Sequence, residues 1–201
     1  MKIESIQQLR ELYGFPSGRA KDKEFFSLDF HATNFINNSP FLVLSTSNNE
    51  GKHDASPRGG GRGFVKVLNE NQLVIPDAKG NNRIDSLTNI VETGKVGLLF
   101  LIPGVDETLR LNGSAFLSTD SKYLDLFTSE KNPTKTCIVI SVEEVYLHCA
   151  KAFMRSKLWD VSAQINRDDF PTMGEMLKDQ LQSKEPAETI KSMIKRYKKD
   201  L

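Results

Sequence analysis

The middle of the chain alternates between apolar runs and clusters of turn residues, a pattern typical of β-strands joined by hairpins. Residues 41–47 open this region, and the Asn-Asn-Glu-Gly sequence after them predicts a tight turn. Similar runs continue as far as the Val-Tyr-Leu-His sequence that ends at residue 148. The pattern predicts strands at residues 41–47, 52–57, 64–68, 72–76, 96–102, 108–118 and 136–148.

Apolar residues at helical spacing flank and interrupt these strands. Two helices are expected before the first strand, one ending at Gly14 and one over residues 30–37. Short helices are expected at residues 84–91 and 123–127. Near the C-terminus, residues 172–175 have the spacing of a capping box, and Pro186 suits the first turn of a last helix.

The order of these elements predicts an α+β fold, mainly β with flanking helices, whose strands form a small barrel. Strand and helix do not alternate strictly, which disfavours a doubly wound parallel sheet. We expect a single domain over residues 1–201, with N-terminal helices over about 1–38 and a helical C-terminal extension over about 150–201.

The amino-acid composition excludes some classes of binding partner for this protein. Lys and Arg number 27 against 26 for Asp and Glu, so no bulk attraction to nucleic acid or to an anionic membrane is expected. The longest apolar run, residues 96–102, is far shorter than the ~20 residues of a membrane span. No apolar signal core follows Met1, and two cysteines cannot form a disulfide framework. These features predict a cytoplasmic protein with reduced thiols.

The first segment that carries chemistry is a glycine-rich stretch with two arginines, residues 56–63. Glycine lets the backbone approach a ligand closely, and the guanidinium groups of Arg58 and Arg62 match phosphate oxygens. The spacing fits neither a P-loop nor a dinucleotide fingerprint. The stretch therefore predicts either an anion site or a solvated hairpin loop.

The second segment, residues 75–83, runs from the end of a predicted strand to the start of a helix. Asn81 or Asn82 is suited to cap that helix, which would leave free backbone N–H groups beside Arg83. Such an arrangement binds phosphate. An ordinary capped loop has the same sequence features and is the alternative.

The third segment, residues 148–159, places two cations four residues apart. In a helix, Lys151 and Arg155 share a face and could hold one anion together. Trp159, the only tryptophan of the sequence, could stack on a planar ring. A basic solvated helix is the alternative. The histidines and cysteines lack the spacing of zinc ligands, so no metal site is expected.

Together these segments resemble the pyridoxamine 5'-phosphate oxidase-like FMN-binding family, the split β-barrel flavoproteins. The similarity is closest to a subgroup of FMN-dependent enzymes whose substrate is unknown, and it covers about residues 28–181. It rests on Ser-Pro-Arg-Gly at 56–59, Ile-Pro-Asp at 75–77, Gly-Asn-Asn-Arg at 80–83, Glu-Thr-Leu-Arg-Leu-Asn-Gly at 107–113, His-Cys-x-Lys-Ala at 148–152 and Arg-Ser-x-Leu-Trp at 155–159.

The resemblance implies a homodimer that binds FMN between its subunits and transfers electrons to or from a small molecule, with a donor such as NAD(P)H. It assigns no catalytic acid or base. The last group of matching positions is expected to reach the partner subunit's flavin. The implied cofactor contacts are Ser56, Pro57, Arg58 and Gly59; Ile75, Pro76 and Asp77; Asn82 and Arg83; Thr108 and Arg110; and Lys151, Arg155 and Trp159.

Three motifs of true pyridoxamine phosphate oxidases are absent: Arg-x-x-x-Leu-Lys, Ser-Arg-Lys and a late Arg-Leu-His. FMN binding is therefore expected, and vitamin B6 oxidation is not. A flavin-binding sensor or carrier without turnover has the same sequence features, and the residues do not distinguish FMN from a deazaflavin. RNA binding through residues 58–63 is disfavoured by the balanced charge and by the lack of aromatic residues in that stretch.

Overall fold

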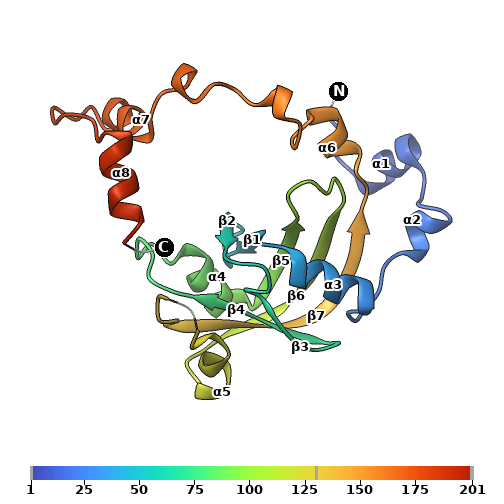
Figure 1. Cartoon of the computed structure of the whole chain (residues 1–201). Helices are drawn as coiled ribbons and strands as arrows, with labels where there is room; N and C mark the ends of the chain where they lie inside the picture. The colour runs from blue at the N-terminus through green and yellow to red at the C-terminus, as the bar shows by residue number, and fades with distance from the viewer. Residues whose placement is uncertain (1, 130, 200–201) are drawn as a thin grey trace.

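The computed structural model describes residues 2–129 and 131–199, in which seven strands form one antiparallel sheet in the order β2-β1-β5-β6-β7-β4-β3 (Figure 1). The ends of the predicted domain, residues 1 and 201, lie outside this range. The sheet agrees with the predicted mainly β fold. Its strands are β1 (Phe41–Ser47), β2 (His53–Gly59), β3 (Lys66–Asn69), β4 (Gln72–Asp77), β5 (Lys95–Leu101), β6 (Thr108–Ser118) and β7 (Thr136–His148).

Strands β1, β6 and β7 have the predicted bounds, and the others are shifted at their ends. The largest changes flank the glycine-rich stretch. β2 continues to Gly59, two residues beyond its predicted end. The prediction that a strand begins at Phe64 is wrong, because Gly63 turns the chain with φ 77° and the Phe64 N–H donates to the carbonyl of Gly61 at 3.0 Å.

The helices follow the predicted order, with two corrections. A short helix, α2, forms in the polar stretch where no helix was expected. Pro186 does not lie in the last helix, which begins after Thr189, whose hydroxyl accepts the N–H of Ser192 at 3.2 Å. The α-helices are α1 (Ile6–Tyr13), α2 (Arg19–Asp22), α3 (Phe30–Asn38), α4 (Asp85–Thr93), α5 (Ser121–Leu124), α6 (Lys151–Ser156), α7 (Met173–Gln180) and α8 (Ile190–Tyr197).

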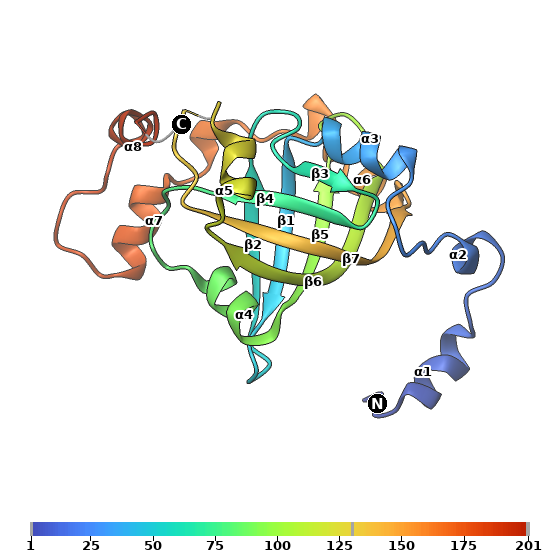
Figure 2. The same ribbon diagram turned by 90° about the horizontal axis from the view of Figure 1, so that it is seen from below.

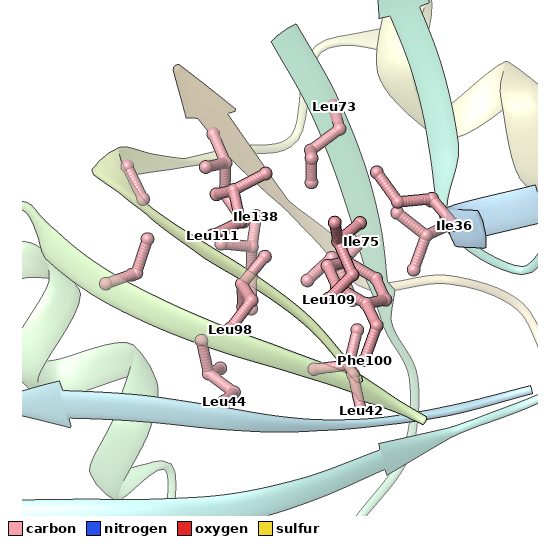
Figure 3. Packing of buried hydrophobic residues seen from close by; sticks show 14 of the residues in the cluster. Ile36, Leu42, Leu44, Leu73, Ile75, Leu98, Phe100, Leu109, Leu111 and Ile138 are labelled. Carbon is pink, nitrogen blue, oxygen red and sulfur yellow. The ribbon is translucent and has the colours of Figure 1, made fainter. Parts of the chain in front are cut away.

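The sheet curls around a hydrophobic core on its inner face (Figure 3). Successive side chains of a strand face opposite sides, so alternate residues of β1, Leu42 and Leu44, are fully buried there. Ile36 brings α3 onto the same core, and Ile90 brings α4. A second, smaller cluster lies on the opposite face of β4 and β7, beneath α5: Val74, Tyr123, Phe127, Cys137 and Val139.

Helix α4 is fixed to the sheet by hydrogen bonds as well as by packing. Asn89 Nδ2 donates to Thr46 Oγ1 of β1 at 2.9 Å, and both residues are buried. Thr93 Oγ1 donates to the carbonyl of Ser47 at 3.0 Å. Because buried polar groups need partners, these bonds determine which face of α4 meets the sheet. The first turn of α4 is held beside β2 by a separate bond, from the Ser86 hydroxyl to Asp54.

Two terminal segments extend away from the sheet on opposite sides of the molecule (Figures 1 and 2). Among the described residues, α1, α7 and α8 bury no side chain. The N-terminal segment is tied to the sheet at Phe25, whose N–H donates to Val145 at 3.0 Å, and at Lys23, whose Nζ donates to Leu147 at 2.9 Å. Apolar side chains such as Ile6, 78% exposed, are left without cover.

None of the helices in residues 2–129 and 131–199 combines the length and the hydropathy that a membrane span requires.

Candidate functional site

The arginine predicted to contact the cofactor lies on the inner face of the edge strand β2. Arg58 and Ser56 pair with core leucines of β1, so both side chains face inward. Asp54, two residues earlier, faces the same way, whereas Pro57 and Gly59 are exposed on the outer face. The start of the glycine-rich stretch is therefore a strand that directs polar groups toward the interior, not a solvated loop.

Neutral oxygen atoms hold the Arg58 guanidinium in place. Nη1 donates to Ser56 Oγ at 2.6 Å and to the carbonyl of Pro57 at 3.0 Å, and Nη2 lies 3.4 Å from Ser86 Oγ of α4. Nε is buried and has no partner. Within residues 2–129 and 131–199, Arg58 forms no ion pair. The chain therefore positions a cation without neutralising it by direct contact.

Ser86 and Asp54 complete this arrangement, and neither was predicted from the sequence as a site residue. Ser86 is 3% exposed in the first turn of α4, and its hydroxyl donates to Asp54 Oδ2. The alternation of Asp54, Ser56 and Arg58 along a strand was the available signal, because residues two apart share a face. The contribution of α4 required the tertiary structure.

Asp77, at the end of β4, lies across from β2. Desolvation by burial raises the pKa of its carboxyl group, although the positive charges of Arg58 and Lys135 act in the opposite direction. Thr136, its partner on β7, has a buried Oγ1 without a hydrogen bond. We name Asp54, Ser56, Arg58, Asp77 and Ser86 the arginine cluster; Asp77 belongs to it through the charge of Arg58, not through a hydrogen bond.

The other predicted residues of β4 offer backbone rather than side chains. Ile75 is fully buried in the core, and Pro76 faces the opposite side of the sheet. Strand β3 pairs with β4 only from Gln72 to Val74, so among the described residues one edge of Ile75–Asp77 has no strand partner. Free backbone groups therefore border the arginine cluster.

The loop before α4 differs from the prediction. Neither Asn81 nor Asn82 caps the helix: Ile84 is the cap residue and makes no side-chain capping bond, and Asn82 has a left-handed φ of 61°. Asn81 Oδ1 instead accepts the N–H of Arg83 at 3.0 Å. The Arg83 side chain is 75% exposed and pairs with Asp85 at 2.9 Å. Arg83 thus lies on the surface, close in sequence to Ser86.

Thr108 and Arg110 lie on the other side of the sheet. They alternate with the core residues Leu109 and Leu111 along β6, so they belong to the outer face. Thr108 is buried, and the exposed Arg110 guanidinium lies 5.6 Å from the centre of the Tyr146 ring of β7. Arg110 is thereby held by an aromatic ring rather than by a carboxylate.

Lys151, Arg155 and Trp159 follow directly after β7. Both cations are exposed on α6, which confirms their predicted helical placement. Trp159 Nε1 donates to the carbonyl of Val105 at 2.9 Å, and its ring lies 5.6 Å from that of Phe153. We name Lys151, Arg155 and Trp159, together with Thr108 and Arg110 of β6, the rim cluster; no hydrogen bond between described residues joins the two sets.

The structure therefore places the predicted contacts Arg58 and Arg110 on opposite faces of the sheet. Pairing runs from Arg110 through Leu99 and Val43 to Pro57, the neighbour of Arg58, so the two arginines lie at similar heights on opposite faces of the sheet. No hydrogen bond between described residues joins the arginine cluster to the rim cluster. Nor do three His, Cys, Asp or Glu side chains in the described ranges form a metal-binding group.

A family model described as pyridoxamine 5'-phosphate oxidase matches residues 28–149, more than half of the chain. The chain belongs to the pyridoxamine 5'-phosphate oxidase family. The family match extends from before α3 to just beyond β7 and includes the arginine cluster, Thr108 and Arg110. It stops before Lys151, so most of the rim cluster lies outside the region that defines the family.

Solved structures show the same fold at low sequence identity. A histidine-to-alanine variant of HupZ from Group A Streptococcus is 16% identical, with a TM-score of 0.51 over 60% of this chain and 98% of that one. A candidate pyridoxamine 5'-phosphate oxidase from Lactobacillus delbrueckii is 20% identical, with a TM-score of 0.50 over 62% and 98% of the two chains. No curated protein matches the sequence.

Proposed function

We propose that this protein binds FMN and acts as an FMN-dependent oxidoreductase on a small molecule. The observation that carries the proposal is the arginine cluster, in which Arg58 is fixed by neutral oxygens while its buried Nε has no partner. A buried donor without a partner is unusual in folded proteins. An anion such as the FMN phosphate would supply the missing acceptor, and family membership makes a flavin the ligand to test first.

The donors around Arg58 fit a flavin mononucleotide. Arg58 and Ser56, with Arg83 and Asn82 of the loop before α4, would hold the phosphate, since charged and neutral donors together match its oxygens. The free edge of Ile75–Asp77 would offer backbone groups to the ring. Bound FMN would supply hydride or electron transfer, and the protein would orient it.

We further propose that the active unit is a homodimer in a split-barrel arrangement. One sheet separates Arg58 from Arg110, so a single small ligand cannot touch both from one copy unless it reaches around an edge. A second copy would bring its rim cluster, with Trp159 to stack and Lys151 and Arg155 to attract anions. The outer face supports this interface, because Phe41 is 38% exposed and Val43 and Leu99 are half-buried.

Absorbance spectroscopy of the purified protein tests the proposal. We expect the spectrum of oxidised FMN at about one flavin per chain, or its appearance on titration with FMN, and bleaching when a nicotinamide donor is added. A protein that binds neither FMN nor riboflavin would contradict the proposed function. A deazaflavin spectrum would show that the bound cofactor is a deazaflavin and not FMN. Flavin that no nicotinamide or small acceptor turns over would favour a carrier or sensor.

A further inference from the structure

Ser86 stands between a carboxylate and the arginine proposed to hold phosphate. Its hydroxyl donates to Asp54, and its oxygen faces Nη2 of Arg58 at 3.4 Å. An ionised carboxylate has no proton to donate, so the single proton of the hydroxyl points to Asp54 and a lone pair points to Arg58. The two bonds therefore have a fixed direction, from arginine to serine to aspartate.

We infer that Asp54 and Ser86 are positioning residues that orient Arg58 for a phosphate group while leaving its charge available; this inference rests on the proposed function. A carboxylate in direct contact with a guanidinium commonly forms two parallel hydrogen bonds with it. That contact would occupy the edge that a phosphate needs. Ser86 takes only one hydrogen bond and keeps Asp54 from direct contact.

The number of N–H donors that Arg58 leaves unused supports this assignment. A guanidinium carries five N–H groups. Nη1 uses two on Ser56 and Pro57, and Nη2 uses one on Ser86. Nε is left without a protein partner, and the single bond of Nη2 leaves one of its two hydrogens over. Nε and Nη2 lie on one edge of the planar group, which matches two oxygens of a phosphate.

Titrations of FMN and riboflavin, followed by flavin fluorescence, test the inference. We expect Ser86→Ala to weaken FMN binding about threefold to tenfold and to leave riboflavin binding unchanged, because riboflavin has no phosphate. Asp54→Asn should act in the same direction, since its amide no longer forces the serine proton away from Arg58. Ser86→Thr keeps the hydroxyl and should retain selectivity for FMN. Thr88→Ala removes an exposed hydroxyl from the same helix and is the matched control.

A second measurement requires no flavin. The Nε–H resonance of Arg58 in 15N-labelled protein, identified by its absence in Arg58→Lys, should exchange slowly with water because the atom is buried. Ser86→Ala should accelerate that exchange. Unchanged exchange and an unchanged FMN-to-riboflavin ratio would overturn the inference, as would equal losses for both flavins. Failure of the wild-type protein to bind flavin would refute the proposed function separately, and the exchange rate would still show whether Ser86 orients Arg58.

Discussion

The arginine cluster and the rim cluster both contain cations that the sequence predicted to be cofactor ligands, yet the chain fixes Arg58 by hydrogen bonds and leaves Lys151 and Arg155 exposed. Arg58 is held by oxygens from β2 and α4 and is partly buried. Lys151 and Arg155 are exposed on a six-residue helix. A side chain fixed in advance loses little freedom when a ligand binds, whereas an exposed lysine or arginine must be ordered at that moment.

This difference indicates that the two clusters would contribute to ligand binding in different ways. In our proposal, the arginine cluster is already positioned to bind the phosphate before the cofactor arrives. In the rim cluster, Thr108 and Arg110 lie on the outer face of the sheet, whereas Lys151, Arg155 and Trp159 follow the end of β7. In our proposal these residues reach a ligand bound to a second copy. Variants in the two clusters should therefore differ in the size of their effect and in their dependence on dimer formation.

Arg58→Ala should produce the largest effect. A charge-assisted hydrogen bond contributes about 1.5–3 kcal/mol, so FMN affinity should fall roughly 10- to 100-fold. Riboflavin affinity should change little. Calorimetric titration of both ligands measures the two affinities. Equal losses would show that the variant damages the fold and not the phosphate contact.

The double variant Lys151→Gln, Arg155→Gln should weaken FMN binding about twofold to thirtyfold, because exposed charge pairs contribute roughly 0.2–1 kcal/mol each. Raising the salt concentration should reduce the difference from the wild type. Light scattering should show an unaltered dimer. A loss of FMN affinity as large as that of Arg58→Ala would show that the two clusters do not differ in their contribution to binding.

Arg83→Ala should lower FMN affinity by less than about fivefold, since the Arg83 side chain is exposed and already paired with Asp85. The measurement is again the FMN titration, with Lys79→Ala in the same loop for comparison. A loss of about 100-fold, the upper end expected for a charge-assisted contact, would make Arg83, and not Arg58, the main phosphate ligand.

Asp77→Asn should give the smallest effect, a modest rise in the midpoint of thermal unfolding at pH 7. Burial raises the pKa of Asp77 in the folded chain, so its contribution to stability is present at low pH and is lost as the pH rises through that raised value. The variant cannot ionise, and its advantage should vanish below the ordinary aspartate value of 3.8. An advantage that is independent of pH would contradict this assignment.

The strands were predictable because most inward-facing residues of β1, β6 and β7 are apolar and each run ends at turn residues. The first turn of α4 was harder to predict. Asn82 looked like a cap, but the chain passes through left-handed backbone at Asn82 and Ile84 and the helix begins without a side-chain cap. Local preferences are weak beside such tertiary constraints.

The candidate site was only partly predictable for a related reason. Arg58 could be identified from local sequence, whereas its partner Ser86 lies 28 residues away on another element. The division of the site between two faces also follows from the strand register, which places Arg58 and Arg110 on opposite sides of one sheet. No local pattern around either arginine contains that information.

Mixing two defective variants tests most directly the claim that one flavin site is assembled from two copies. Arg58→Ala disables the arginine cluster and Trp159→Ala disables the rim, so each variant alone should bind FMN poorly. When the two are co-expressed and assort freely, half of the dimers are mixed and each carries one intact site, so about a quarter of all sites should recover wild-type affinity. FMN binding by the mixture that is no better than the average of the two variants would contradict the claim.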